Sequence, residues 1–92
     1  MPRAVALIAV VAKSERVLEK VAHKHDGITP WEVDEAVVRT PVEASRWVHD
    51  DERGWRLKVA GRTAAGRRLL VVLYPVDEDD GVWRLGTAIR DD

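Results

Sequence analysis

Positive charge is concentrated in one stretch of this 92-residue chain. Residues 53–68 include no acidic side chain, and their basic ones are Arg53, Arg56, Lys58, Arg62, Arg67 and Arg68. The planar guanidinium group of arginine binds two phosphate oxygens at once, so such a cluster suits a polyanion. The net charge is only −1, because acids collect at residues 50–52, 77–80 and 91–92. A local patch would therefore attract the ligand, and strong non-specific binding to nucleic acid is not expected.

Three side chains could transfer protons next to such a patch: His25, His49 and Tyr74. His25 has a simple structural alternative, which we favour, because a histidine at the C-terminal end of a helix interacts well with the helix dipole.

The residue spacing predicts no metal site and no cofactor. His23 and His25 are two positions apart on an expected helix and point in different directions. The acidic run 77–81 lacks the glutamate that closes a calcium loop. The glycines of residues 61–66 have the spacing of a phosphate loop, but Arg67, Arg68 and a strand follow them. Each of these segments is better explained as an exposed helix end or a turn.

Length and composition predict a single domain, residues 1–92, with one apolar core. The chain has no cysteine, which excludes disulfides and thiol catalysis and favours a reducing, cytoplasmic compartment. The longest apolar run, residues 4–12, is too short to span a bilayer, so no membrane association is expected. We interpret residues 5–11 as a strand buried on both faces rather than a signal peptide.

Two helices are expected, over residues 14–25 and 30–39. In the first, Val17, Leu18, Val21 and Ala22 form one apolar face, and Gly27 allows the chain to turn. The second begins with a capping box, in which Thr29 is the N-cap residue, Pro30 the first helical residue and Glu32 the third. Thr40-Pro41 should end it.

The remaining chain predicts strands at residues 45–49, 55–61, 68–75 and 82–90. The fold class is α+β, with two N-terminal helices packed on one face of an antiparallel sheet of about four to five strands. Alternation directs Trp55, Leu57, Val59, Trp83, Leu85 and Ile89 toward the helices. The opposite, open face then carries Arg56, Lys58, Arg68, Tyr74, Arg84 and Arg90. This face either holds a polyanion such as RNA or is an ordinary solvated surface.

The four tryptophans supply bulk in a chain that has no phenylalanine. Trp31, Trp55 and Trp83 are expected in the core or at a partner contact. Trp47, next to Arg46, is expected to be the most exposed of the four and is a candidate partner contact.

Several motifs occur in the order found in one known family. Lys24-His25, Gly27-Ile28 and the segment from Glu32 to Ala36 are similar to the K-H-G-[IV] and E-E-A opening of BrnT-type toxins. Residues 56–63 (R-L-K-V-A-G-R-T) resemble R-[YF]-x-x-[IV]-G-R-T, Gly66-Arg67 with residues 69–72 resembles G-R-x-L-x-V-V, and residues 84–88 resemble the last strand. The resemblance covers about residues 13–90.

This resemblance implies a RelE-like fold and a metal-independent endoribonuclease, the toxin of a type II toxin–antitoxin pair. It also implies a protein antitoxin, commonly with a ribbon-helix-helix part. We therefore expect an exposed apolar surface near Trp47 and the N-terminal strand, which self-association would cover when the antitoxin is absent. The positions that match the motifs of this family are His25, Arg56, Arg62, Arg84 and Arg90. The resemblance implies catalytic roles for them. Two alternatives stay open: a non-catalytic protein-interaction module on the same fold, and a nucleic-acid-binding domain without cleavage.

Overall fold

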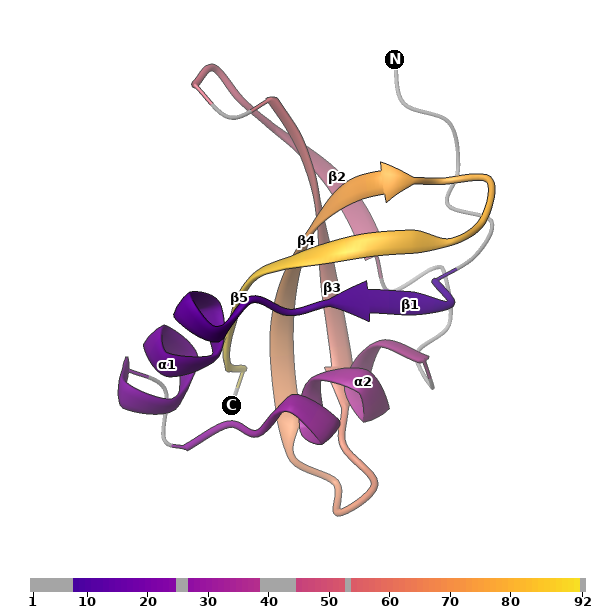
Figure 1. Cartoon of the computed structure of the whole chain (residues 1–92). Helices are drawn as coiled ribbons and strands as arrows, with labels where there is room; N and C mark the ends of the chain where they lie inside the picture. Colours follow the sequence, from indigo (N-terminus) through magenta and orange to yellow (C-terminus); the bar gives the residue numbers. More distant parts are fainter. Residues whose placement is uncertain (1–7, 25–26, 39–44, 53, 92) are drawn as a thin grey trace.

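The computed structural model of the chain describes residues 8–24, 27–38, 45–52 and 54–91 (Figure 1). Its elements in chain order are β1 (Val10–Ala12), α1 (Glu15–Lys24), α2 (Pro30–Val38), β2 (Ser45–Asp50), β3 (Gly54–Arg62), β4 (Arg68–Asp77) and β5 (Val82–Arg90). The strands form one sheet in the order β1-β5-β4-β3-β2. The α+β class is confirmed, as are both helices and the strands predicted after them.

The sheet is mixed, whereas an antiparallel sheet was predicted. Strands β2 to β5 form an antiparallel series, but β1 pairs in parallel with β5, with Val10 opposite Val82. A strand therefore precedes both helices, and it lies at the edge of the sheet. In β1 only Val11 is buried, since Val10 and Ala12 are exposed. The prediction of a strand buried on both faces was wrong for these residues, and residues 5–7 lie outside the described ones.

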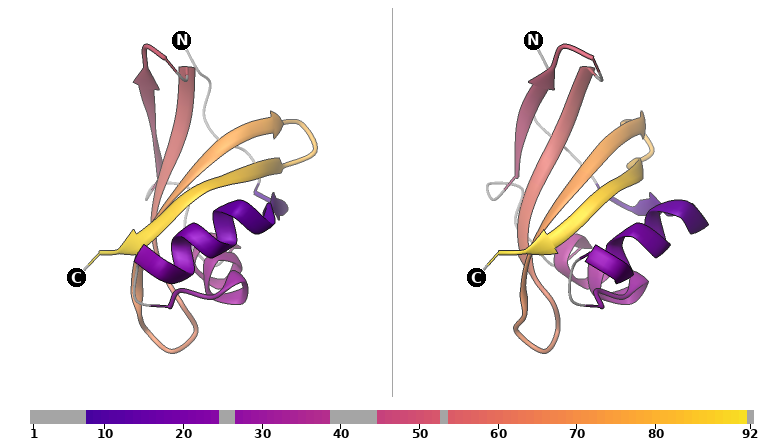
Figure 2. Two further views of the ribbon diagram at one scale, coloured as in Figure 1. Left: turned by 60° about the vertical axis from the view of Figure 1, so that its left-hand side comes forward. Right: turned by 90° about the vertical axis from the view of Figure 1, so that its left-hand side faces the viewer.

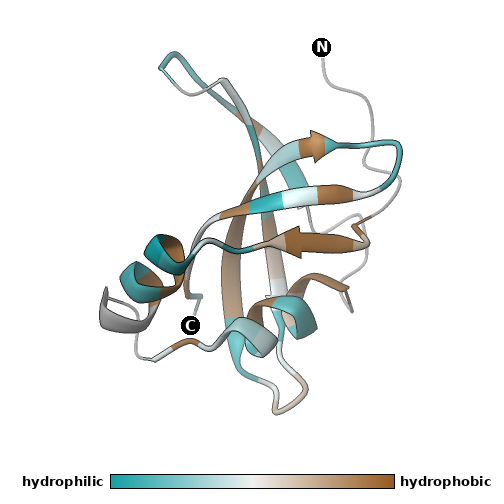
Figure 3. Cartoon of the chain, viewed as in Figure 1, coloured by the Kyte–Doolittle hydropathy of each residue, from teal (hydrophilic) through white to brown (hydrophobic). Residues whose placement is uncertain are grey.

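The core lies between the two helices and one face of the sheet (Figure 2). Helix α2 packs on β3 and β4, and α1 packs next to β5. The strands contribute Leu57, Val59, Leu69, Val71, Leu73, Trp83, Leu85 and Ala88, all nearly inaccessible to solvent. In Figure 3 the strongly apolar segments accordingly run through the strands, and polar ones cover the exposed parts of the helices.

A bulge at Gly86 reverses the alternation of β5. Leu73 lies opposite Leu85 and Val72 opposite Thr87, so Gly86 is an extra residue in β5. Before the bulge, Trp83 and Leu85 point into the core; after it, Ala88 does. The predicted inward position of Ile89 and open-face position of Arg90 were therefore wrong. Arg90 lies opposite the buried Leu69, on the helix side of the sheet.

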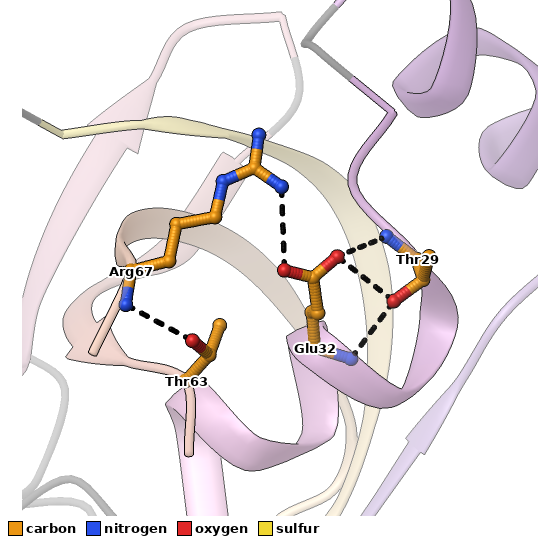
Figure 4. A network of polar contacts seen from close by, with 4 residues as sticks. All are labelled: Thr29, Glu32, Thr63 and Arg67. Atoms are coloured by element: carbon orange, nitrogen blue, oxygen red, sulfur yellow. Dashed lines mark hydrogen bonds and ion pairs between the residues drawn. The ribbon is translucent and has the colours of Figure 1, made fainter. Parts of the chain in front are cut away.

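The capping box of α2 is confirmed (Figure 4). The Thr29 N–H donates to Glu32 Oε1 at 3.0 Å, and the Glu32 N–H donates to Thr29 Oγ1 at 3.4 Å. Two backbone donors at the helix start are satisfied in this way. Ile28, just before the cap, is buried in the same cluster as Val33. The residues proposed to end this helix, Thr40-Pro41, lie outside the described residues.

The tryptophans differ from one another more than was predicted. Trp83 is buried in the core, as expected for a large apolar side chain. Trp31 and Trp55 are 65% and 43% exposed, so of their two predicted roles only partner contact stays open. Trp47 was expected to be the most exposed, but it packs against Trp83 with ring centroids 5.6 Å apart. It lies opposite Leu57 and so points to the core side of the sheet.

Candidate nucleic-acid interface

The face of the sheet opposite the helices is rich in cations. We call it the open face; its described basic residues are Arg46, Arg56, Lys58, Arg62, Arg68 and Arg84. Its acidic residues within the described strands are Asp50 and Asp77, and Asp91 follows β5 beside Arg68. Each basic residue alternates with a neighbour that points to the core side, which places it on this face. The predicted open-face residues Arg56, Lys58, Arg68, Tyr74 and Arg84 therefore do share one surface.

Tyr74 is held between an arginine and a glycine on the neighbouring strand. It lies opposite Arg84 in the β4–β5 ladder, and the guanidinium carbon of Arg84 is 5.3 Å from the centre of the Tyr74 ring. A Cβ atom at Gly86 would lie 2.5 Å from Tyr74 Cε2 and 3.2 Å from the carbonyl oxygen of Val72. The ring thus rests directly on the Gly86 backbone, and only glycine fits beneath it.

A groove of about 660 Å³ opens next to this pair, between β5 and the start of α1. We call it the Tyr74 groove; it is lined by Ser14, Arg16, Val17, Tyr74, Arg84, Leu85 and Gly86. Arg16 and Arg84 are both exposed, so two guanidinium groups border an open space with a phenol at its wall. Paired guanidinium groups and a phenol can bind a phosphate and exchange a proton with a group next to it.

The start of α1, which forms one side of the groove, is fixed by local contacts. Ser14 Oγ accepts a hydrogen bond from the Val17 N–H at 3.2 Å, which is the N-cap arrangement. Lys13 Nζ donates to the Val11 carbonyl and to Asp34 Oδ1, both at 2.8 Å, and so links the end of β1 to α2. Arg16 therefore projects from an anchored helix end.

Arg56 lies next to Tyr74 on the other side. Leu57 pairs with Leu73 across the antiparallel strands β3 and β4. Arg56 precedes Leu57 and Tyr74 follows Leu73, so the two lie next to each other just beyond this pair. Its Nη1 is 3.9 Å from Asp50 Oδ2, and its buried Nε has no hydrogen-bond partner among the described residues. Arg56, Tyr74 and Arg84 thus form a row across three neighbouring strands.

Arg62 and Arg68 lie far from this row. They are opposite each other at the other end of the β3–β4 ladder. Arg62 is six positions after Arg56, which is about 20 Å along a strand. Lys58 lies between them, opposite Arg46 and Val72. The candidate catalytic residues Arg56 and Arg62 therefore cannot contact the same phosphate.

The predicted proton-transfer groups are divided among different places. His25 lies outside the described residues. His49 is on the core side of β2, where its ring contacts Trp55 with centroids 4.8 Å apart and its Nδ1 is 3.8 Å from Asp51 Oδ1. Tyr74 lines the groove, and His49 does not.

Sequence reasoning missed Ser14, Arg16 and Gly86. Arg16 alternates with Glu15 and Glu19, a pattern typical of a solvated helix face, so nothing in the sequence separated it from other surface cations. Gly86 did carry a signal, because a glycine inside a strand often marks a bulge or a close contact.

Comparisons with family models, with curated proteins and with solved structures gave no match to this chain. Within the described ranges, no helix is long and apolar enough to cross a membrane. The same ranges contain no cluster of three His, Asp or Glu side chains able to hold a metal ion.

Proposed function

We propose that this chain is a metal-independent endoribonuclease, the toxin of a type II toxin–antitoxin pair of the BrnT type with a RelE-like fold. The observation that carries the proposal is the row of Arg56, Tyr74 and Arg84, with Arg84 5.3 Å from the Tyr74 ring and the groove next to both. The motifs of residues 13–90 that resemble the BrnT family support it independently. The motifs of residues 56–63 and 84–88 contribute Arg56 and Arg84 to the row, and the motif of residues 66–72 extends into the adjoining β3–β4 ladder.

The chemistry requires three tasks, and the row supplies groups suited to two of them. RNA cleavage by the 2′-hydroxyl needs a base for that hydroxyl, stabilisation of the charged phosphorane, and a proton for the leaving 5′-oxygen. Arg84 and Arg56 would stabilise the phosphorane, because guanidinium groups bind phosphate oxygens in pairs. The Tyr74 hydroxyl would donate the proton. The base is not assigned to a described residue.

Arg62, Arg68 and Lys58 have a different role in this proposal. In the proposal these three residues bind RNA beyond the reacting phosphate. Arg62, about 20 Å from Arg56 along β3, becomes a binding residue rather than a catalytic one. Arg90 has no part in it, because it lies on the helix side of the sheet.

A protein antitoxin, possibly of the ribbon-helix-helix type, is the proposed partner. The exposed aromatic surface formed by Trp55 and His49 at the β2–β3 end is the candidate contact, with Trp47 beneath it. An exposed apolar surface of this kind commonly marks a protein interaction site. Self-association through the same surface is expected when the antitoxin is absent.

The test is expression of the chain and of an Arg84→Ala variant in bacteria, followed by RNA cleavage assays with and without ribosomes in the presence of EDTA. The wild-type chain should arrest growth and cut RNA, and Arg84→Ala should lose a hundredfold or more in rate, since one donor to developing charge contributes about that much. The matched control is Lys20→Ala, an exposed cation on α1. RNA binding without cutting would favour the nucleic-acid-binding alternative, and neither property would favour the interaction module.

A further inference from the structure

Two pairs of like charges lie directly opposite each other on the open face. Arg62 faces Arg68 across β3 and β4, and Arg46 faces Lys58 across β2 and β3. Like charges at directly opposed positions destabilise a sheet. Within the part of the chain that the structure describes, none of these four side chains makes an ion pair. A ligand that brings negative charge to both places would relieve this repulsion.

Each of the two pairs, and the Tyr74 row, has one member on β3. On β3, Arg56, Lys58 and Arg62 all point to the open face, and the groove is at the Arg56 end. These cations cover about 20 Å at the usual rise of a strand. Asp50 is 3.9 Å from Arg56 at one end of this line, and at the other end the Asp91 N–H donates to the Arg68 carbonyl at 3.0 Å. Between them, Lys58 and Arg62 form no ion pair with a described acid.

Apolar side chains lie next to the cations at the Arg62–Arg68 end of the open face. Leu70 is opposite Ala60 on one side and Ile89 on the other, and both Leu70 and Ile89 are partly exposed. Unpaired bases can lie on such a surface while their phosphates meet the cations. Bases inside a duplex cannot, because they are paired and stacked.

We propose that a single strand of RNA lies along β3 on the open face. The reacting phosphate would be at the Tyr74 groove, and further phosphates would be at the Arg46–Lys58 pair and the Arg62–Arg68 pair. This inference rests on the proposed function and names its substrate as single-stranded RNA of roughly 4 nucleotides or more, near the lower limit for small sheet-based binding domains.

The experiment compares two fluorescent RNAs, a dinucleotide and an octamer of the same composition, each 2′-O-methylated so that no cleavage occurs. The octamer should bind at least about tenfold more tightly at low salt, and its affinity should fall more steeply with salt because it contacts more phosphates. Arg62→Gln should weaken octamer binding and reduce the salt slope by about 0.7, the value for one phosphate of a single strand. Dinucleotide binding should not change, and Lys20→Gln should alter neither RNA.

Three results would overturn the inference: equal affinity for the two RNAs, Arg62-dependent binding of a duplex as tight as the octamer, or tighter Arg62-dependent binding of an acidic peptide. The last would assign the face to a protein partner. The inference and the proposed function fail separately. An unmodified octamer that binds with the predicted length dependence but is never cut would refute the nuclease alone, whereas cutting without length dependence would refute only the path along β3.

Discussion

The guanidinium group of Arg67 donates a hydrogen bond of 3.2 Å to Glu32 Oε2, which joins the start of α2 to the β3–β4 turn (Figure 4). The other carboxylate oxygen of Glu32 accepts from the Thr29 backbone N–H and hydroxyl. One side chain thus completes a helix cap and ties that helix to a hairpin. The helix start and the hairpin should therefore lose stability together when Glu32 is altered.

Acid should weaken the fold through Glu32. Burial raises the pKa of Glu32, but hydrogen bonds from Thr29 and the contact with Arg67 outweigh it and lower the pKa below its ordinary value of 4.5. A pKa lowered by folding contributes stability above the unfolded value, and this is lost as pH falls through the folded pKa. Urea unfolding from pH 7 to pH 3 should show this loss, and Glu32→Gln should reduce its size. The control is Glu19→Gln, at an exposed position, and this variant should have the same dependence of stability on pH as the wild-type chain.

Thr63→Val should destabilise the β3–β4 turn. The Thr63 side chain is buried, and its Oγ1 accepts a hydrogen bond from the Arg67 N–H at 3.0 Å. Valine keeps the shape and removes the acceptor, which costs roughly 1–3 kcal/mol when a buried donor is left unpaired. Chemical unfolding measures the change, with Thr87→Val on the open face as the control. Equal stability of the two variants would contradict this role for the hydroxyl.

Gly86→Ala should displace Tyr74 and should abolish the proposed RNA cleavage without unfolding the protein. The added methyl group would meet the Tyr74 ring at 2.5 Å. Overpacking of this kind costs roughly 1–3 kcal/mol. A double-mutant cycle tests the cause: in a Tyr74→Ala background, the destabilisation by Gly86→Ala should become much smaller. An undiminished effect there would assign the strain to the strand backbone instead.

Trp83→Ala should destabilise the protein far more than Trp31→Ala. Trp83 is 1% exposed and contacts Trp47, so its removal leaves a large cavity that costs about 3–5 kcal/mol. Trp31 is 65% exposed, and its substitution should change the free energy of unfolding by about 0.5 kcal/mol or less. Thermal or urea unfolding of the two variants provides the comparison, and similar losses would contradict the assigned packing.

Local signals made most of the fold predictable. The Thr29–Glu32 cap marks the start of α2. Simple alternation places Leu57 and Val59 on one face of β3 and the basic residues Arg56 and Lys58 on the other. Both signals depend on residues close in sequence, which is why they can be recognised without the structure.

Features that depend on distant contacts were not predictable in the same way. The parallel pairing of β1 with β5 depends on which sheet edge is left available, and no local pattern specifies that. The bulge at Gly86 reverses the alternation of β5. The prediction assumed strict alternation and therefore placed Arg90 on the wrong face of the sheet. The Tyr74 groove requires α1 to approach β5, so the contribution of Arg16 could be seen only in three dimensions.

The pairing of β1 with β5 also has a consequence for how the protein folds. Val10 pairs with Val82, so β1, the first described strand, can form its ladder only after β5, the last strand, has been synthesised. The antiparallel series from β2 to β5 joins neighbours in sequence and can form first. Contacts between such distant residues form slowly, because a long loop must close before they contribute. During synthesis on the ribosome, β1 therefore has no partner strand until β5 has been made. We expect the pairing of β1 with β5 to be the last step of folding.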